Sequence, residues 1–418
     1  MFITALDIGS SKIKALVAEV AGDGKLFLAG VFKIPSAGVR KGEIVDFNET
    51  TNALSGIFNK IKELNKSALK NIFVNINSAK TKCQISKGFV AVSRADNEIS
   101  SDDIERAVKS SQTIRLSHNR TILHNITREF IIDGVSDIRD PLGMAGARLE
   151  VSSLIIDSFS QNIKDTINCV KSLNGGIGGL IYGPLASARS VLTKIKKDLG
   201  TVLIDIGAQT TGLSVYEEGK LLHAAAFPVG SAHITNDLAI GLKCSVEAAE
   251  LIKIFFGQAQ TKEISGKEKI TSDIFRAKTG VNIKELDKNF KAAPSKRFIA
   301  EIIEVRLAEI FEFIHNELKL IGQAGKLPAG AVITGGGAEM PLIVDLAKNE
   351  LKLSAEIGIP DIGELDLYNA EFKEQIENPE LAAAVGLLLW GRDEGFKKSG
   401  WPIKNRFSLK KILRYFEP

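Results

Sequence analysis

Two short stretches of the chain, Leu6–Ser10 (LDIGS) and Ile204–Ala208 (IDIGA), carry the same Asp-Ile-Gly sequence. Each follows a run of β-forming residues and precedes a second strand, predicted over residues 12–20 in the first copy and 210–216 in the second. A turn and a third predicted strand come next, over residues 26–32 and 221–227. The chain is therefore predicted to contain a duplicated β-unit, in two α/β domains that face each other.

The two Asp-x-Gly turns are suited to holding phosphate. A glycine after the aspartate allows the next backbone amides to turn towards a phosphate, and the carboxylate can hold Mg²⁺ through water. One such turn alone is more often an ordinary tight hairpin, but two copies in register favour a clamp on the β- and γ-phosphates of a nucleotide. Lys12 opens the second strand within reach of a phosphate, and the alternative is that it is an exposed lysine on an edge strand. The predicted metal-facing and catalytic residues are Asp7 and Asp205, and the predicted phosphate contacts are Gly9, Ser10, Ser11, Lys12, Gly207, Gln209, Thr210 and Thr211.

A third glycine-rich element lies at residues 330–341 (GAVITGGGAEMP). A short strand is predicted over 331–334, followed by Gly335, Gly336 and Gly337 and by a helical stretch over 342–351. Such a loop presents bare backbone to a ligand, and the start of a helix favours anionic groups. The element is neither a Walker A loop nor a GxGxxG fingerprint, so it is weak by itself.

The order of two phosphate loops and one glycine loop resembles the actin-like ATPase superfamily, and one stretch narrows the resemblance. Residues 133–151 (DGVSDIRDPLGMAGARLEV) are similar to the pattern Asp-Pro-(Ile/Val)-Gly-Met-x-Gly-x-Arg-Leu-Glu of the FtsA family of bacterial division proteins. The resemblance covers nearly the whole chain and implies an α/β, actin-like (ribonuclease H-like) fold with duplicated domains and an inserted 1C subdomain. Further FtsA-like stretches are residues 38–46, 184–188, 235–239, 249–253 and 378–386.

The resemblance implies ATP and Mg²⁺ as cofactors, and it assigns more of the site. It implies that Glu250 and Lys253 contact the ribose and adenine and that Gly230 and Met340 also bind the cofactor. Without the resemblance, Glu250 and Lys253 would be interpreted as an exposed pair on one helix face. Gln209 stands where the family usually has glycine, and Gly183 stands where a glutamate commonly precedes the Pro-Leu-Ala motif. These departures bear on hydrolysis more than on binding, so at most slow ATP hydrolysis is expected.

The resemblance also divides the chain into subdomains. The expected order is 1A (1–87), 1C (88–166), 1A (167–200), 2A (201–229), 2B (230–295), 2A (296–362), 1A (363–394), a linker (395–406) and a C-terminal helix (407–418).

Composition excludes several classes of protein. A composition of 44% apolar and 25% charged residues is ordinary for a globular protein. A chain of 418 residues is longer than those that usually fold around a single hydrophobic core, so two domains or several subdomains are expected. Its three cysteines lie far apart and cannot form a disulfide framework or a zinc site, and its five histidines lack metal-site spacing. No signal peptide or membrane-spanning window is visible, so the protein is expected to stay in the cytoplasm. The net charge of +4 is small, and no nucleic-acid-binding body is expected.

The positive charge gathers in the last residues, which predict a basic amphipathic helix. Apolar residues in the segment 407–416 recur at helical spacing, basic residues fall on the other side, and Ser408 can cap the start. The alternative is an ordinary terminal helix packed on the body. The preceding linker and the one-sided basic content favour a helix lying in an anionic membrane surface. The predicted membrane contacts are Phe407, Leu409, Lys410, Lys411, Ile412, Leu413, Arg414 and Phe416.

The function implied by the resemblance is that of an ATP-binding, polymerising membrane adaptor of cell division. Such a protein tethers filaments of FtsZ, held through 2B, to anionic lipid on the cytoplasmic face of the inner membrane at the division septum, associates with itself into filaments, and helps to recruit the division machinery. One alternative is a pilus-assembly protein similar to PilM, which would lack the motif at residues 140–150 and the terminal helix. A small-molecule kinase would need a carboxylate base and a polar pocket, and a heat-shock chaperone would need a further substrate-binding region.

Overall fold

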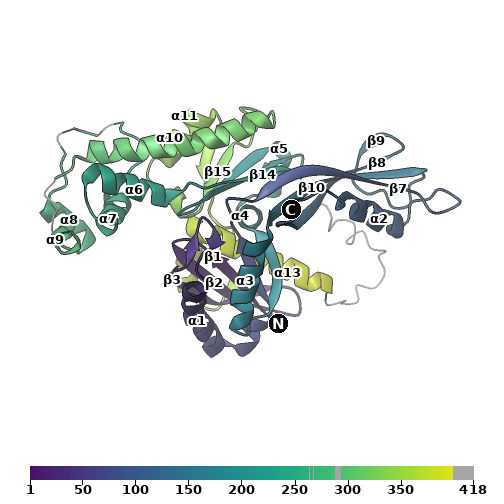
Figure 1. Cartoon of the computed structure of the whole chain (residues 1–418), viewed down its shortest axis with the longest axis horizontal. Helices are drawn as coiled ribbons and strands as arrows, with labels where there is room; N and C mark the ends of the chain where they lie inside the picture. Colours follow the sequence, from purple (N-terminus) through teal and green to yellow (C-terminus); the bar gives the residue numbers. More distant parts are fainter. Residues whose placement is uncertain (263, 267, 288–292, 399–418) are drawn as a thin grey trace.

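The computed structural model describes residues 1–262, 264–266, 268–287 and 293–398, and its main body is a pair of domains with the same sheet topology (Figure 1). The first sheet has the strand order β11-β6-β1-β2-β3-β17, and the second has the order β14-β13-β12-β15-β16. In both, the central strand pairs antiparallel with its hairpin partner and parallel with the strand on its other side. The predicted duplication and α/β fold class are therefore confirmed.

The elements of the first domain include both strands of its hairpin and the helices that cover its sheet. Its strands are β1 (Phe2–Ile8), β2 (Lys12–Val20), β3 (Leu26–Pro35), β4 (Val39–Arg40), β5 (Glu43–Ile44), β6 (Ile72–Ile76), β11 (Ile177–Tyr182) and β17 (Leu365–Leu367). Its helices are α1 (Phe47–Leu64), η1 (Lys66–Lys70), α3 (Ser160–Ser172), α4 (Gly183–Val191), α12 (Glu371–Ile376), η3 (Pro379–Leu381) and α13 (Ala382–Lys398).

The second domain repeats the order of the core strands and contains the long helix α10. Its strands are β12 (Thr201–Ile206), β13 (Thr211–Glu217), β14 (Lys220–Phe227), β15 (Ala331–Thr334) and β16 (Ala355–Ile357). Its helices are α5 (Lys194–Leu199), which packs on β13, α6 (Ser231–Leu242), α7 (Val246–Phe256), α8 (Ser272–Thr279), α9 (Ile283–Leu286), α10 (Lys296–Leu320), η2 (Gly336–Glu339) and α11 (Ile343–Leu351).

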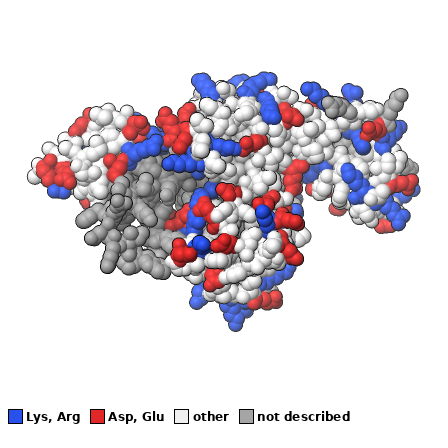
Figure 2. Space-filling view, turned by 180° about the vertical axis from the view of Figure 1, so that it is seen from behind, with Lys and Arg blue, Asp and Glu red and all other residues white. Residues whose placement is uncertain are grey.

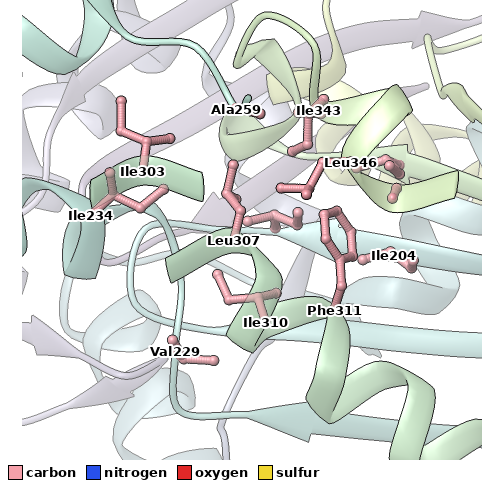
Figure 3. Packing of buried hydrophobic residues seen from close by; sticks show 14 of the residues in the cluster. Ile204, Val229, Ile234, Ala259, Ile303, Leu307, Ile310, Phe311, Ile343 and Leu346 are labelled. Carbon is pink, nitrogen blue, oxygen red and sulfur yellow. The ribbon is translucent and has the colours of Figure 1, made fainter. Parts of the chain in front are cut away.

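The core of the second domain lies between its sheet and the long helix α10. Leu307, Ile310 and Phe311 of α10 are buried and pack with Ile204 of β12 and Leu346 of α11 (Figure 3). Their spacing of three to four residues places them on one helix face, and this burial of apolar area is the main source of stability for the domain. The core holds β12 rigidly, and β12 ends at the second Asp-Ile-Gly turn.

An inserted sheet of order β7-β10-β8-β9 forms a separate arm, with α2 (Ser101–Ser111) on one of its faces (Figure 1). A capping box between Ser100 and Asp103 starts α2. The predicted limits 88–166 differ from this sheet: residue 88 lies inside β7, and residue 166 lies inside α3, which packs under α1. The strands of the insertion are β7 (Lys82–Ala91), β8 (Arg120–Ile132), β9 (Val135–Ile138) and β10 (Arg148–Phe159).

The structure sets the start of α1 and the end of α13. Helix α1 begins at Phe47, because the side chain of Asp46 accepts a hydrogen bond from the amide of Glu49 and caps the helix. At the other end, α13 continues to Lys398, so the first residues of the predicted linker at 395–406 are helical. The predicted membrane contacts from Phe407 to Phe416 lie outside the described residues. Within the part of the chain that the structure describes, no helix is long and apolar enough to span a bilayer.

Candidate functional site

A cavity of about 300 Å³ lies between the two domains, and both Asp-Ile-Gly turns and the glycine loop line it. Two predicted residues do not line it. Thr211 is buried in β13 and donates to the carbonyl of Val229, and Gly230 lies behind the second turn, where a Cβ atom would come 2.4 Å from the carbonyl oxygen of Gly207. The predicted residues that line it are Asp7, Gly9, Ser10, Ser11, Lys12, Asp205, Gly207, Gln209, Thr210, Glu250, Lys253, Gly335, Gly336, Gly337 and Met340.

The first hairpin places a buried ion pair at the floor of the cavity. The amide of Gly9 donates to the carbonyl of Lys12 (3.1 Å), and a Cβ at Gly9 would lie 2.7 Å from that oxygen, so the turn requires glycine. Asp7 lies opposite Lys14 in the register of β1 and β2. The Nζ atom of Lys14 is 2.7 Å from Oδ2 of Asp7, and Nδ2 of Asn75 donates to Oδ1. Both oxygens of the Asp7 carboxylate are thus engaged.

Lys14 is the cation that sequence reasoning missed. Burial acts to lower the pKa of Lys14, but the charges of Asp7 and Glu380 outweigh it and the pKa is raised, so Lys14 stays charged. Lys12, which was predicted instead, is half exposed and pairs with Glu380 (2.9 Å). The hairpin register contained the missing signal, because the residue opposite the aspartate in a tight antiparallel pair is its nearest partner.

The second hairpin has the same backbone but no lysine. The amide of Gly207 donates to the carbonyl of Thr210 (2.9 Å), and the register places Gly212 opposite Asp205. Oδ2 of Asp205 accepts a hydrogen bond from Oγ of Ser187 on α4 (2.7 Å). Burial, and then the negative charge of Asp7, raise the pKa of Asp205. Among the described residues Asp205 forms no ion pair, although the charge of Lys14 acts to lower its pKa.

The glycine loop joins the second domain to the turn that precedes α13. Gly335 has a φ of +83°, and its amide donates to the carbonyl of Pro379 (3.1 Å), which also accepts from Oγ1 of Thr334 (3.1 Å). Asn378 caps this turn by accepting from the amide of Glu380 (2.7 Å). The carboxylate of Glu380 is thereby held at the rim of the cavity, between the glycine loop and the first hairpin.

Glu250 and Lys253 on α7 do not form an exposed helix pair. The side chain of Lys253 is only 9% exposed, and its Nζ atom contacts Oε2 of Glu250 (2.6 Å) and donates to Oγ1 of Thr235 (2.9 Å). Thr235 in turn donates to Glu250. Glu250 and Lys253 line one wall of the cavity, and their hydrogen bonds with Thr235 hold their polar groups in place.

The two departures from the family pattern have structural explanations. Oε1 of Gln209 accepts a hydrogen bond from the amide of Lys41 in the turn between β4 and β5 (2.9 Å), so this side chain bridges the two domains. At Gly183, a Cβ atom would lie 1.7 Å from Oδ1 of Asn77. Asn77 therefore fills the space that a side chain at position 183 would need. Its Oδ1 atom is buried beside the cavity and has no hydrogen-bond partner among the described residues.

One histidine joins a second polar cluster that sequence spacing could not reveal. Nδ1 of His223 is 3.3 Å from Sγ of Cys83, and Nε2 is 2.6 Å from Oε1 of Glu317. Burial raises the pKa of the Cys83 thiol to about 11, so this thiol is not a poised nucleophile. The cluster connects β7 of the insertion to β14 and α10 of the second domain.

The residues of the cavity fit a hydrated divalent cation. No group of three or more His, Cys, Asp or Glu side chains in the described ranges could hold a metal ion directly. Asp7 and Asp205 nevertheless both face the cavity, and the repulsion between them contributes to the raised pKa of Asp205. A cation held through water between phosphate and these carboxylates would relieve that repulsion.

Comparison with known families gives a consistent result. The family model of cell division protein FtsA matches residues 202–386, and that of the SHS2 domain inserted in FtsA matches residues 78–157. The FtsA of Pseudomonas aeruginosa is 32% identical over 393 residues, covering 93% of this chain and 89% of that protein. The FtsA of Bacillus subtilis is 33% identical over 402 residues, covering 94% and 86%.

Solved structures share the fold at much lower identity. The PilM–PilN type IV pilus biogenesis complex matches with a TM-score of 0.61 and 16% identity, covering 93% of this chain and 98% of that one. MreB 5 of Spiroplasma citri bound to AMPPNP matches with a TM-score of 0.54 and 14% identity, covering 95% and 97%. At this identity the likeness establishes the actin-like fold alone.

Proposed function

Because the chain belongs to the FtsA family of bacterial cell division proteins, we propose that it binds ATP with Mg²⁺ in the cavity between its two domains. The observation that carries the proposal is the convergence of both Asp-Ile-Gly turns and the glycine loop on one cavity. Each turn offers backbone amides, and Lys14 supplies a positive charge that burial has not neutralised.

In this proposal, different residues of the cavity bind different parts of the nucleotide. The amides of Ser10, Ser11 and Thr210 hold the phosphates, and Lys14 neutralises part of their charge. The trio of Glu250, Lys253 and Thr235 holds the ribose and one edge of the base, and Met340 lies against the base. A bound Mg²⁺ would be held through water near Asp7 and Asp205, where it would offset the negative charge of the phosphates.

Calorimetric titration of the full chain with ATP and Mg²⁺ tests this site. We expect saturable binding of one nucleotide, and Asp205→Ala should weaken it. Unchanged affinity in Asp205→Ala would contradict the clamp. Thr279→Ala in α8, remote from the cavity, is a matched control that should bind as the wild type does.

We further propose that the protein is the membrane adaptor for FtsZ filaments at the division septum. The support is family membership together with the basic amphipathic pattern of residues 407–416. Residues 230–295 are the proposed FtsZ-binding region. The anchor of one chain should be weak, and assembly into filaments would strengthen it through multivalency.

Sedimentation with vesicles of anionic lipid tests the anchor. A chain truncated after Asn405 should lose binding, and equal sedimentation of the truncated and full chains would contradict the proposal. Leu413→Glu should release the protein at any salt concentration, because it places a charge on the apolar side. Lys411→Glu should weaken binding mainly at low salt and mainly to anionic lipid.

Self-association through the insertion is the remaining part of the proposal. Ile85 and Phe89 on the edge strand β7 are 56% and 63% exposed, and Val135 on the opposite edge strand is 64% exposed. Exposed apolar side chains on edge strands favour contact with another chain. Phe89→Glu should therefore reduce the filaments seen by electron microscopy with ATP present, and undiminished filaments would contradict this role.

A further inference from the structure

The rim of the cavity holds one carboxylate that is surrounded by lysines. Oε1 of Glu380 is 2.9 Å from Nζ of Lys12, and Oε2 is 3.2 Å from Nζ of Lys33. Nζ of Lys14 donates to the backbone carbonyl of the same glutamate (2.8 Å). The Glu380 side chain is 14% exposed, and burial acts to raise its pKa, but the charges of Lys14, Lys33 and Lys12 outweigh this and lower the pKa.

This arrangement occupies the cations that a polyphosphate would need. Lys12 and Lys14 line the cavity between the two phosphate turns, and each already faces a carboxylate, Glu380 or Asp7. Lys33 contacts Glu380 from β3 and is not among the residues that line the cavity. A phosphate entering the cavity would therefore compete with Glu380 for Lys12. The carboxylate of Glu380 would then keep Lys33 as its counter-ion.

The position of Glu380 in the chain links this competition to both domains. Its turn accepts hydrogen bonds from Thr334 and Gly335 of the second domain, and α13 of the first domain starts two residues later. A change in the ion pairs of Glu380 would therefore alter the contact between the glycine loop and the start of α13.

We propose that Glu380 is an internal counter-anion that holds the phosphate-facing lysines until a nucleoside di- or triphosphate binds and displaces it from Lys12. The inference rests on the proposed nucleotide site and adds a positioning residue to it. The carboxylate opposes nucleotide binding and makes the affinity depend on the number of phosphates. Lys33 has the opposite effect, because it stabilises the displaced carboxylate.

The test is a calorimetric double-mutant cycle with ADP, AMP and adenosine in the presence of Mg²⁺. Glu380→Gln keeps the shape of the side chain and removes one negative charge near the phosphates, so ADP affinity should rise by at least about threefold. The rise should be smaller for AMP, absent for adenosine, and reduced at high salt.

Lys33→Met should lower ADP affinity, and in the Glu380→Gln background the same substitution should have no effect. Glu364→Gln is the matched control, because Glu364 is also a carboxylate held by cations, Arg189 and Arg392, but does not line the cavity. It should change ADP affinity by less than about twofold.

The possible results separate this inference from the proposed function. If the wild type binds ADP but Glu380→Gln binds it equally or more weakly, the counter-anion role is overturned and the nucleotide site stands. An additive effect of the two substitutions would also overturn it. If the wild type binds no nucleotide at all, the proposed function and this inference both fail.

Discussion

In the first hairpin the residue opposite the aspartate is Lys14, whereas in the second it is Gly212, although the two hairpins share strand order, direction and turn. The cause lies in the neighbouring helix. A Cβ at Gly212 would come 2.4 Å from Cγ of Pro184, so α4 occupies the space that Lys14 fills in the first copy. The same backbone thus carries an ion-paired carboxylate in the first domain and, among the described residues, a carboxylate without an ion pair in the second.

The electrostatic state of the two aspartates follows from this difference. Asp7 has Lys14 and Asn75 as partners, whereas Asp205 has the hydroxyl of Ser187 and the repulsion of Asp7. In the proposed nucleotide site, the first hairpin would neutralise phosphate and the second would face a hydrated cation. The two hairpins share their backbone arrangement, and packing of the second hairpin against α4 accounts for the difference between their side chains. On the surface shown in Figure 2, by comparison, acidic and basic side chains are intermixed.

Removing the lysine of the first hairpin should have the largest effect. Lys14→Met leaves the buried Asp7 without its ion-pair partner and should lower the free energy of unfolding by about 3–5 kcal/mol. Binding of ADP should fall below detection in the same variant. Urea unfolding and calorimetry measure the two effects, and the double variant Lys14→Met with Asp7→Asn should recover part of the stability. A loss under about 1 kcal/mol would show that the pair is not essential.

Filling the space at Gly212 tests the reason for the asymmetry. Gly212→Ala should cost about 1–3 kcal/mol, because the added methyl group meets Pro184 and the surrounding core must shift. Gly56→Ala in α1 is the control, since a Cβ there meets nothing within 4 Å and a helical alanine should be neutral or stabilising. Equal stabilities of the two variants in urea would contradict the packing explanation.

Removing the second carboxylate should lower affinity and change the pH dependence of stability. Asp205→Asn should weaken binding of ADP with Mg²⁺ by about 10- to 100-fold, as for other groups around a bound metal. Because the pKa of Asp205 is raised in the folded state, its ionisation destabilises the fold as pH rises from the unfolded value through the folded one. Asp205→Asn should therefore stabilise the nucleotide-free protein more at pH 7 than at pH 4. The opposite trend in thermal unfolding would contradict the assignment.

Gln209 should have the smallest effect, because its contact lies at the rim. Gln209→Ala removes one exposed hydrogen bond to the amide of Lys41 and should cost less than about 1 kcal/mol. The affinity for ADP should change by less than about threefold. A loss of binding similar to that of Asp205→Asn would show that this bridge, rather than the aspartates, controls the cavity.

The sequence predicted the frame of the site better than its partners. The repeated Asp-Ile-Gly turns, the strand before the glycine loop and the helix that carries Glu250 and Lys253 were all visible as local patterns. Lys14 was recoverable from hairpin register, but Ser187, Asn75 and Glu380 come from elements distant in the chain. Their side chains meet the aspartates and lysines only through tertiary packing, which no spacing rule encodes.

The most direct test of the account is hydrogen exchange of the full chain with and without ADP and Mg²⁺. ADP should protect the amides of residues 9–12 and 207–211 together, because both turns would hold the same phosphates. The glycine loop at residues 335–337 should gain protection at the same nucleotide concentration. Protection of one turn without the other would contradict the central claim that the two hairpins close on a single nucleotide.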